Sequence, residues 1–177
     1  MANLQAPELV VDGTNVAWAW PRSRTCLVRK DHAGAQRLLV STATESALRS
    51  AYAQLTFVFD GPPPPAGPGS STAVRVLYPD PGQSADERIV ELVVQAVHGG
   101  AAPVVATSDR ALRELVRREG GTTIGGQALI QKLDPRTGAD SRRGATSPRE
   151  GADKPRPSSR DTEAWLERFS GDKRTPR

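Results

Sequence analysis

The stretch Glu8-Leu9-Val10-Val11-Asp12-Gly13-Thr14-Asn15-Val16 decides the expected fold. A short apolar run between turn-forming residues is typical of a strand buried on both faces of a parallel sheet. This run ends at Asp12, and open α/β sheets bind their ligands at the carboxyl ends of their strands. Residues 57–60 and 104–109 repeat the arrangement of an apolar run that ends in an aspartate. We therefore expect three strands to bring aspartates to one edge of a sheet, where a metal cation would offset their repulsion.

Length and composition limit the possible classes of protein. The 177 residues suit one domain with a tail, and a hydrophobic content of 37% is low for a chain that folds throughout. The formal net charge of +4 favours a polyanionic partner such as nucleic acid. The single cysteine, Cys26, excludes a disulfide framework and a cysteine zinc site. Without a signal peptide or an apolar run of membrane-spanning length, we expect a cytoplasmic protein with no membrane partner.

Alternating apolar patterns predict strands and helices over residues 1–133, the pattern of a three-layer α/β/α sandwich with a mainly parallel sheet. Strands are expected at residues 8–12, 55–59, 72–78, 104–107 and 122–124, and helices at residues 33–54, 84–98, 109–119 and 127–133.

The clearest of these helices begins at Ser84. Glu87 lies three residues later, so the two are expected to form a capping box. Asp86 precedes Ile89 by three residues and Val93 by seven, which puts it in phase with the inward-facing stripe of the helix. We therefore expect Asp86, rather than Glu87, to point at the edge of the sheet where the other aspartates lie.

A basic segment follows the first strand. We expect it either to follow a phosphate backbone or to form a solvated surface loop; its cations are Arg22, Arg24, Arg29, Lys30 and Arg37. Trp18 and Trp20, just before it, either stack on bases or pack the segment onto the core.

Composition changes sharply at residue 134. Residues 134–160 are rich in Pro, Arg, Ser and Gly, which predicts a disordered linker. Residues 161–170 predict a short amphipathic helix with Trp165, Leu166 and Phe169 on one side, which docks on the domain or on a partner. Residues 171–177 are expected to be disordered.

Each aspartate also has a structural explanation. Asp12 and Asp60 each precede a glycine and suit a turn, Asp109 suits a helix N-cap, and Asp86 suits the dipole of its helix. Together these explanations are weaker, because three strand-to-helix junctions would then carry acids by coincidence. We therefore favour a functional role for the set.

Other chemistries lack the residues that they need. An aspartyl nucleophile of the phosphatase kind needs an acid two positions before Asp12, where Val10 stands. The sequence holds neither a P-loop nor a dinucleotide-binding glycine motif, so no organic cofactor is expected. His32 and His98 share no motif spacing for a triad or a zinc site.

Four motifs occur in an order that resembles the YacP-like branch of the NYN domains, within the PIN-like ribonuclease superfamily. They are Val10-Val11-Asp12-Gly13-Thr14-Asn15-Val16-Ala17-Trp18-Ala19-Trp20-Pro21, Phe57-Val58-Phe59-Asp60-Gly61, Ser84-Ala85-Asp86-Glu87-Arg88-Ile89 and Val105-Ala106-Thr107-Ser108-Asp109-Arg110. The resemblance covers roughly residues 8–133. Thr14, where many members carry an aromatic residue, and the proline run after Asp60 depart from the family pattern.

The resemblance implies a PIN-like (NYN) sandwich whose strand-end acids bind Mg²⁺ or Mn²⁺ for RNA cleavage. The implied metal ligands and catalytic residues are Asp12, Asp86 and Asp109, with Asn15, Ser108, Asp60 and Glu87 as supporting groups. Arg110 and the basic residues Arg22, Arg24, Arg29 and Lys30 are expected to neutralise flanking phosphates.

The leading hypothesis is a metal-dependent endoribonuclease that acts on single-stranded or ribosome-associated RNA. One rival is a PIN-like module that binds RNA or the ribosome without cutting it, and a second is a small-molecule phosphoesterase.

Overall fold

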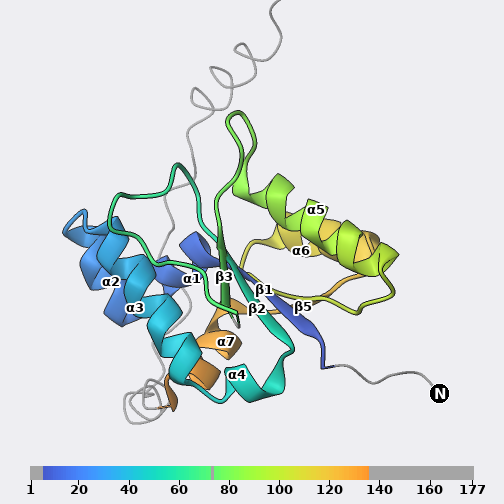
Figure 1. The fold of residues 1–177 in the computed structure, drawn as a ribbon, viewed down its shortest axis with the longest axis horizontal. Helices are drawn as coiled ribbons and strands as arrows, with labels where there is room; N and C mark the ends of the chain where they lie inside the picture. Colours follow the sequence, from blue (N-terminus) through green and yellow to red (C-terminus); the bar gives the residue numbers. More distant parts are fainter. Residues whose placement is uncertain (1–5, 73, 136–177) are drawn as a thin grey trace, which may run out of the picture. The chain divides into compact units, whose positions relative to one another are not determined.

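The computed structural model describes residues 6–72 and 74–135, which belong to the first of the chain's two compact units, Met1–Gly144 (Figure 1). The linker beyond residue 135, the helix predicted at residues 161–170 and the C-terminal end lie outside the described residues. Of the helices within them, none combines the length and the hydropathy of a membrane span.

A five-stranded sheet forms the centre of the described residues. Its strands are β1 (Glu8–Asp12), β2 (Gln54–Val58), β3 (Val74–Leu77), β4 (Val104–Ala106) and β5 (Thr122–Ile124), in the order β3-β2-β1-β4-β5, and every pairing is parallel. The chain passes from β1 outward to β3 and then returns to β4 on the other side of β1. The strand order therefore reverses between β1 and β4, and open sheets bind ligands outside the carboxyl ends at such a reversal.

Helices cover both faces of the sheet. Their bounds are α1 (Gly13–Ala19), α2 (Pro21–Val28), α3 (His32–Glu45), α4 (Leu48–Ala51), α5 (Ala85–His98), α6 (Arg110–Arg118) and α7 (Gly126–Leu133). One hydrophobic cluster joins the sheet to α1–α4 and α7, and a second joins its other face to α5 and α6 (Figure 1). The predicted three-layer α/β/α sandwich is confirmed.

Alternate residues of β1 supply the two clusters. Leu9 and Val11 pack in the first cluster, while Val10 packs in the second, opposite Ile89 of α5 and Leu112 of α6. All three strand residues are at most 2% exposed. A strand buried on both faces needs a continuous apolar run, which is why the sequence of β1 lacks polar alternation.

Residues 22–30 form most of a helix and its end, which corrects the alternative of a solvated surface loop and leaves the phosphate contacts a prediction. Pro21 occupies the first turn of α2, where its fixed φ and missing N–H are tolerated. Trp20, which is fully buried, and Leu27 hold this helix on the core. The short apolar stripe is hidden among charged residues in the sequence, so periodicity alone does not reveal the helix.

The helix predicted at residues 33–54 is interrupted. Helix α3 ends at Glu45, and α4 begins after an extended residue, Ser46, whose hydroxyl donates to the Ala43 carbonyl at 2.8 Å. Such local side-chain hydrogen bonds compete with helix continuation. The predicted apolar face is buried at Leu39 and Ala43 but exposed at Ala47 and Ala51.

Gly13 allows the turn from β1 into α1 to pack closely. A Cβ atom at this position would lie 2.5 Å from the Phe59 ring, which is itself buried and stacked on Phe57. We expect Gly13→Ala to lower the free energy of unfolding by about 1–3 kcal/mol, the usual cost of overpacking a core. Urea unfolding measures this change. Gly69→Ala is the control, because a Cβ at Gly69 meets nothing within 4 Å; equal losses in the two variants would contradict the packing explanation.

Candidate active site

Asp12 ends β1 and is buried at the point where the strand order reverses. Its side chain is 6% exposed. One carboxylate oxygen, Oδ1, accepts the backbone N–H of Asn15 at 3.1 Å and so caps α1, and Oδ2 accepts the hydroxyl of Thr107 at 2.8 Å. The turn chemistry considered for Asp12 is therefore helix capping, and one carboxylate joins β1, α1 and the end of β4.

Burial raises the pKa of Asp12 from its ordinary value of 3.8 to about 6. The hydrogen bonds from Thr107 and Asn15 lower this pKa, while the negative charges of Asp86 and Asp60 raise it further. Desolvation therefore outweighs the two donors. Asp12 is a carboxylate that the fold keeps partly dry and leaves with an unbalanced negative charge near pH 7.

Asn15 and Ser108 connect the ends of β1 and β4. The Oδ1 atom of Asn15 accepts the backbone N–H of Ser108 at 3.0 Å, and the Oγ atom of Ser108 accepts the N–H of Gly126 at 3.3 Å. These bonds fix the β4 junction against both α1 and α7. The structure thus places both predicted supporting residues beside Asp12, in positions that hold the backbone.

Asp109 follows β4 and caps α6. Its Oδ1 atom accepts the N–H of Leu112 at 2.8 Å, and its own N–H donates to the Thr107 hydroxyl at 3.0 Å. The Thr107 side chain therefore contacts both Asp12 and the backbone of Asp109. The capping role predicted for Asp109 is confirmed, and its metal-binding role stays a prediction.

Asp86 and Glu87 lie in the first turn of α5 but differ in their surroundings. Glu87 completes the predicted capping box: its carboxylate accepts the N–H of Ser84 at 2.8 Å, and its own N–H donates to the Ser84 hydroxyl at 3.2 Å. These bonds lower the pKa of Glu87. Asp86 accepts no hydrogen bond from a described residue, and partial desolvation and the charges of Asp109, Asp60 and Glu87 raise its pKa.

Asp86 is exposed rather than buried on the inward stripe, which corrects part of its prediction. The buried stripe of α5 runs through Ala85, Ile89 and Leu92, so Ala85 rather than Asp86 takes the inward position in the first turn. The charge of Asp86 nevertheless couples to Asp12, Asp60 and Asp109. Asp86 thus lies at the edge of the sheet with the other acids.

Asp60 follows β2, on the other side of Asp12 from Asp109. Its backbone N–H donates to the hydroxyl of Thr14 at 2.9 Å, and its negative charge acts on both Asp12 and Asp86. The edge of the sheet thus gathers four aspartates, which come from three adjacent strands and one helix: Asp12, Asp60, Asp86 and Asp109.

The donor set fits a divalent cation by its chemistry. Carboxylate oxygens are the ligands that Mg²⁺ and Mn²⁺ prefer, and mutual repulsion of the acids is what a cation relieves. Among the described residues, no three His, Cys, Asp or Glu side chains form a group that could hold a metal ion. Mg²⁺ commonly uses only one or two carboxylates, with waters and substrate phosphate as its other ligands, so the arrangement suits an open site rather than a closed protein cage.

The predicted RNA-binding residues do not form one cluster. Arg22 lies over the Trp20 ring, 5.2 Å from its centroid, and pairs with Asp134 at 3.4 Å. Arg24 and Arg29 line a surface hollow on α2, and Lys30 follows the end of that helix. Arg110 is 92% exposed and pairs with Glu114 at 3.3 Å. Their contacts to phosphate stay predictions.

Thr107 and Thr14 are site residues to which no role was assigned from the sequence, where Thr14 stood out only as a departure from the family pattern. Each lies within a quoted motif: Thr107 donates to the Asp12 carboxylate, and Thr14 accepts the backbone N–H of Asp60. Hydroxyl residues next to strand-end acids are the signal that could have identified them.

Replacing Thr107 with valine tests its role as a donor to Asp12. Valine keeps the shape but leaves the buried carboxylate without the bond from the hydroxyl. Hydrogen bonds to charged groups contribute about 1.5–3 kcal/mol, so we expect the free energy of unfolding in EDTA at pH 7 to fall by about 2 kcal/mol. Thr107→Ser keeps the hydroxyl and removes only the methyl group, so it should recover most of the loss; equal losses in the two variants would contradict the role assigned to the hydroxyl.

The sequence matches the family model of the YacP-like NYN domain over residues 9–169. Two crystal structures of Rae1 (YacP) from Bacillus subtilis are similar in fold. One, of a mutant form of that protein, is 23% identical, with 77% of this chain and 80% of that chain covered and a TM-score of 0.61. The other structure is 22% identical, with 91% of each chain covered and a TM-score of 0.55. No curated protein matches the chain significantly.

Proposed function

The chain belongs to the YacP-like NYN domain family, a PIN-like nuclease family, and from this membership we propose that it is a metal-dependent endoribonuclease. The reaction is hydrolysis of RNA phosphodiester bonds at the edge of the sheet where Asp12, Asp60, Asp86 and Asp109 meet. The proposed substrate is single-stranded or ribosome-associated RNA, and the proposed cofactor is Mg²⁺ or Mn²⁺.

The observation that carries this proposal is the coupling of the four aspartates. Burial together with the charges of Asp86 and Asp60 brings the pKa of Asp12 to about 6. A fold that gathers negative charge around a desolvated carboxylate loses stability unless a cation offsets it. The sheet reversal between β1 and β4 is also where ligands bind in open α/β folds.

The contacts of each polar side chain at this edge of the sheet indicate its proposed role. Asp12, Asp86 and Asp109 are the proposed oxygen ligands, directly or through waters on the ion, with Asp12 held in one orientation by Thr107 and the Asn15 backbone. Asn15 and Ser108 hold the β4 junction that carries Asp109. The chemistry that Mg²⁺ or Mn²⁺ would supply there is polarisation of the scissile phosphate and a lowered pKa of an attacking water.

Asp60 and Glu87 have supporting roles in this proposal. Asp60 adds negative charge beside Asp12 and Asp86, and Glu87 fixes the first turn of α5 through its capping box. Exposed arginines such as Arg24 and Arg110 are available to neutralise flanking phosphates. No side-chain nucleophile is needed, consistent with an apolar residue, Val10, two positions before Asp12.

The test is cleavage of labelled single-stranded RNA in Mn²⁺, Mg²⁺ or EDTA, with the affinity for the same RNA measured in parallel. We expect the wild type to cut only with a divalent cation and Asp12→Asn not to cut. The matched control is Glu45→Gln, which removes one negative charge from the exposed end of α3 and should leave cleavage unchanged.

The other outcomes identify the rival functions. Salt-sensitive RNA binding that is equal in wild type and Asp12→Asn, without any cutting, would indicate a non-catalytic RNA- or ribosome-binding module. Hydrolysis of a chromogenic phosphodiester without RNA binding would indicate a small-molecule phosphoesterase.

A further inference from the structure

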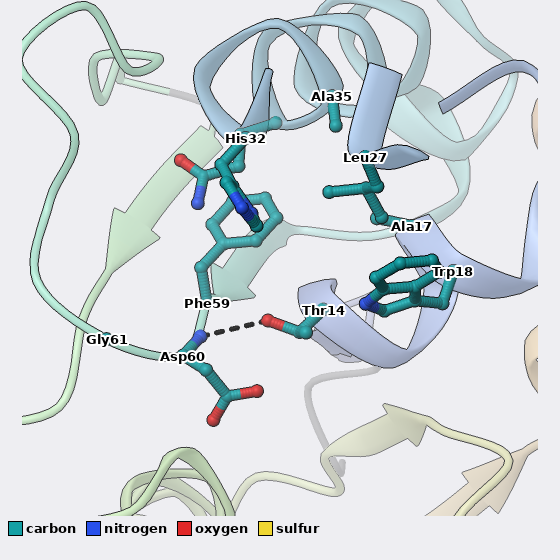
Figure 2. Close-up of a pocket in the computed structure, with 10 residues that line it drawn as sticks. Thr14, Ala17, Trp18, Leu27, His32, Ala35, Phe59, Asp60 and Gly61 are labelled. Atoms are coloured by element: carbon teal, nitrogen blue, oxygen red, sulfur yellow. Dashed lines mark hydrogen bonds between the residues drawn. The ribbon is translucent and has the colours of Figure 1, made fainter. Parts of the chain in front are cut away.

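A pocket of about 220 Å³ lies beside Asp60, between α1, α2, α3 and the end of β2 (Figure 2). Its apolar lining comes from Ala17, Leu27, Ala35 and Phe59, which are all buried. The walls are therefore fixed by the core of the domain. Two of the four are alanines, and their small side chains leave the space open.

Polar groups lie among these apolar walls. Thr14, His32 and Gln36 line the pocket, and Gln36 is only 8% exposed. The Oε1 atom of Gln36 accepts the Tyr78 hydroxyl at 2.8 Å, which fixes the amide, while its Nε2 atom donates to no described residue. A buried amide donor in a pocket that also carries an imidazole suits the hydrogen-bonding edge of a ligand.

Trp18 lines the same pocket and is 48% exposed. Trp20, two residues later, is fully buried and anchors α1 and α2 to the core. Figure 2 shows the Trp18 indole on one side of the pocket and the His32 imidazole on the other. An indole that the core does not need is an available stacking surface for a flat ring.

Asp60 connects the pocket to the acidic edge. Its backbone lines the pocket, with its N–H donating to Thr14, and Figure 2 shows its carboxylate pointing away from the other pocket residues. The negative charge of that carboxylate acts on Asp12 and Asp86. A ligand in the pocket would therefore lie next to the proposed cleavage site.

We propose that this pocket binds one nucleobase of the RNA strand, stacked on Trp18, with its sugar and phosphate leading past Asp60 to the acids. This inference rests on the proposed function and adds a substrate subsite to it. The volume of 220 Å³ is below the roughly 300–1,000 Å³ of pockets that enclose drug-sized ligands, so it suits one ring system. Apolar walls with a few polar groups match the flat faces and polar edge of a base.

The test is a double-mutant cycle between Trp18 and single bases of the RNA. The affinity of the full chain for a short single-stranded RNA is measured in EDTA, so that nothing is cut, and is compared with that for RNAs carrying one abasic nucleotide at each position in turn. We expect one position to lose about 5- to 150-fold in the wild type, the equivalent of about 1–3 kcal/mol per stacked base.

In Trp18→Ala the same abasic nucleotide should lower the affinity by less than about twofold, because the side chain on which the base stacks is already absent. Trp18→Phe keeps an aromatic ring and should restore most of the position dependence. Trp18→Leu keeps apolar bulk without a ring and should behave as Trp18→Ala. The control is Glu45→Gln, at the exposed end of α3 and outside this pocket, which should behave as the wild type.

The two proposals can fail separately. If the protein cuts the RNA, but each abasic nucleotide lowers the affinity equally for wild type and Trp18→Ala, the proposed base pocket is wrong and the proposed nuclease function stands. If one abasic position is coupled to Trp18 but the protein does not cut RNA in Mn²⁺, the base pocket stands and the proposed nuclease function is wrong.

Discussion

Asp12→Asn is expected to make the metal-free protein more stable at pH 7 while it abolishes RNA cleavage. The pKa of Asp12 is about 6 in the folded state and 3.8 ordinarily. Because the folded-state pKa is the higher one, protonation of Asp12 favours the folded state. This contribution to stability is complete below pH 3.8 and is lost as the pH rises through 6. A difference of about two pKa units corresponds to about 3 kcal/mol at pH 7.

Asparagine avoids the cost of burying that charge. Its Oδ1 atom can still accept from the Asn15 backbone, but its NH₂ group must face the Thr107 hydroxyl, which reduces the gain. We expect a net gain of about 1–2 kcal/mol in EDTA, or a midpoint several degrees higher, since about 1 kcal/mol shifts the midpoint of such a domain by a few degrees.

Thermal and urea unfolding in EDTA from pH 4 to pH 8 measure this effect. The difference between Asp12→Asn and the wild type should grow as the pH rises from 4 to 7 and then stay constant. Glu87 and Glu91 have lowered pKa values and shape the profile of both proteins in the opposite sense, so the difference isolates Asp12. A variant that is less stable than the wild type at pH 7 would contradict the desolvation argument.

Asp109→Asn is expected to lose cleavage while it keeps the stability of α6. Asp109 caps this helix through its Oδ1 atom, and asparagine is an equally good N-cap. A metal ligand, however, needs the carboxylate charge. Activity should fall by more than the roughly 10–100-fold that is typical of outer-shell substitutions at metal sites.

Asp109→Ala separates the two roles. Alanine removes both the cap and the charge, so the free energy of unfolding should fall by about 1 kcal/mol relative to Asp109→Asn, with cleavage equally low in the two variants. If Asp109→Asn cuts RNA as the wild type does, Asp109 is a helix cap alone and the proposed ligand set is wrong.

The sheet and the helices of the second half of the domain could be predicted from the sequence because the patterns that indicate them are local. The three central strands, β1, β2 and β4, carry short, mainly apolar runs that lead to an aspartate, and α5 combines a capping box with a complete apolar stripe. The reversal of strand order places three of those runs side by side. Apolar periodicity therefore sufficed for the sandwich and for the edge at which the acids lie.

Helices α1 and α2 could not be predicted in the same way. They bury few residues and therefore show little apolar periodicity. Instead, the Asp12 carboxylate caps α1, and the buried Trp20 fixes the junction between the two helices. The exposure of Asp86 could not be predicted either, because Ala85 and Asp86 precede Ile89 by four and three residues and both spacings fit an apolar stripe; the structure turns Ala85 onto the core. The base pocket depends on contacts among four elements that no local pattern encodes.

The measurement that tests the central claim most directly is Mn²⁺ binding to wild type, Asp12→Asn and Glu45→Gln, followed by electron paramagnetic resonance at pH 7. If the aspartates at the edge of the sheet hold the cation, the wild type and Glu45→Gln bind Mn²⁺ alike and Asp12→Asn binds it at least about tenfold more weakly. Equal binding by the wild type and Asp12→Asn, or none by either, would contradict the assignment of this edge as a metal-dependent cleavage site.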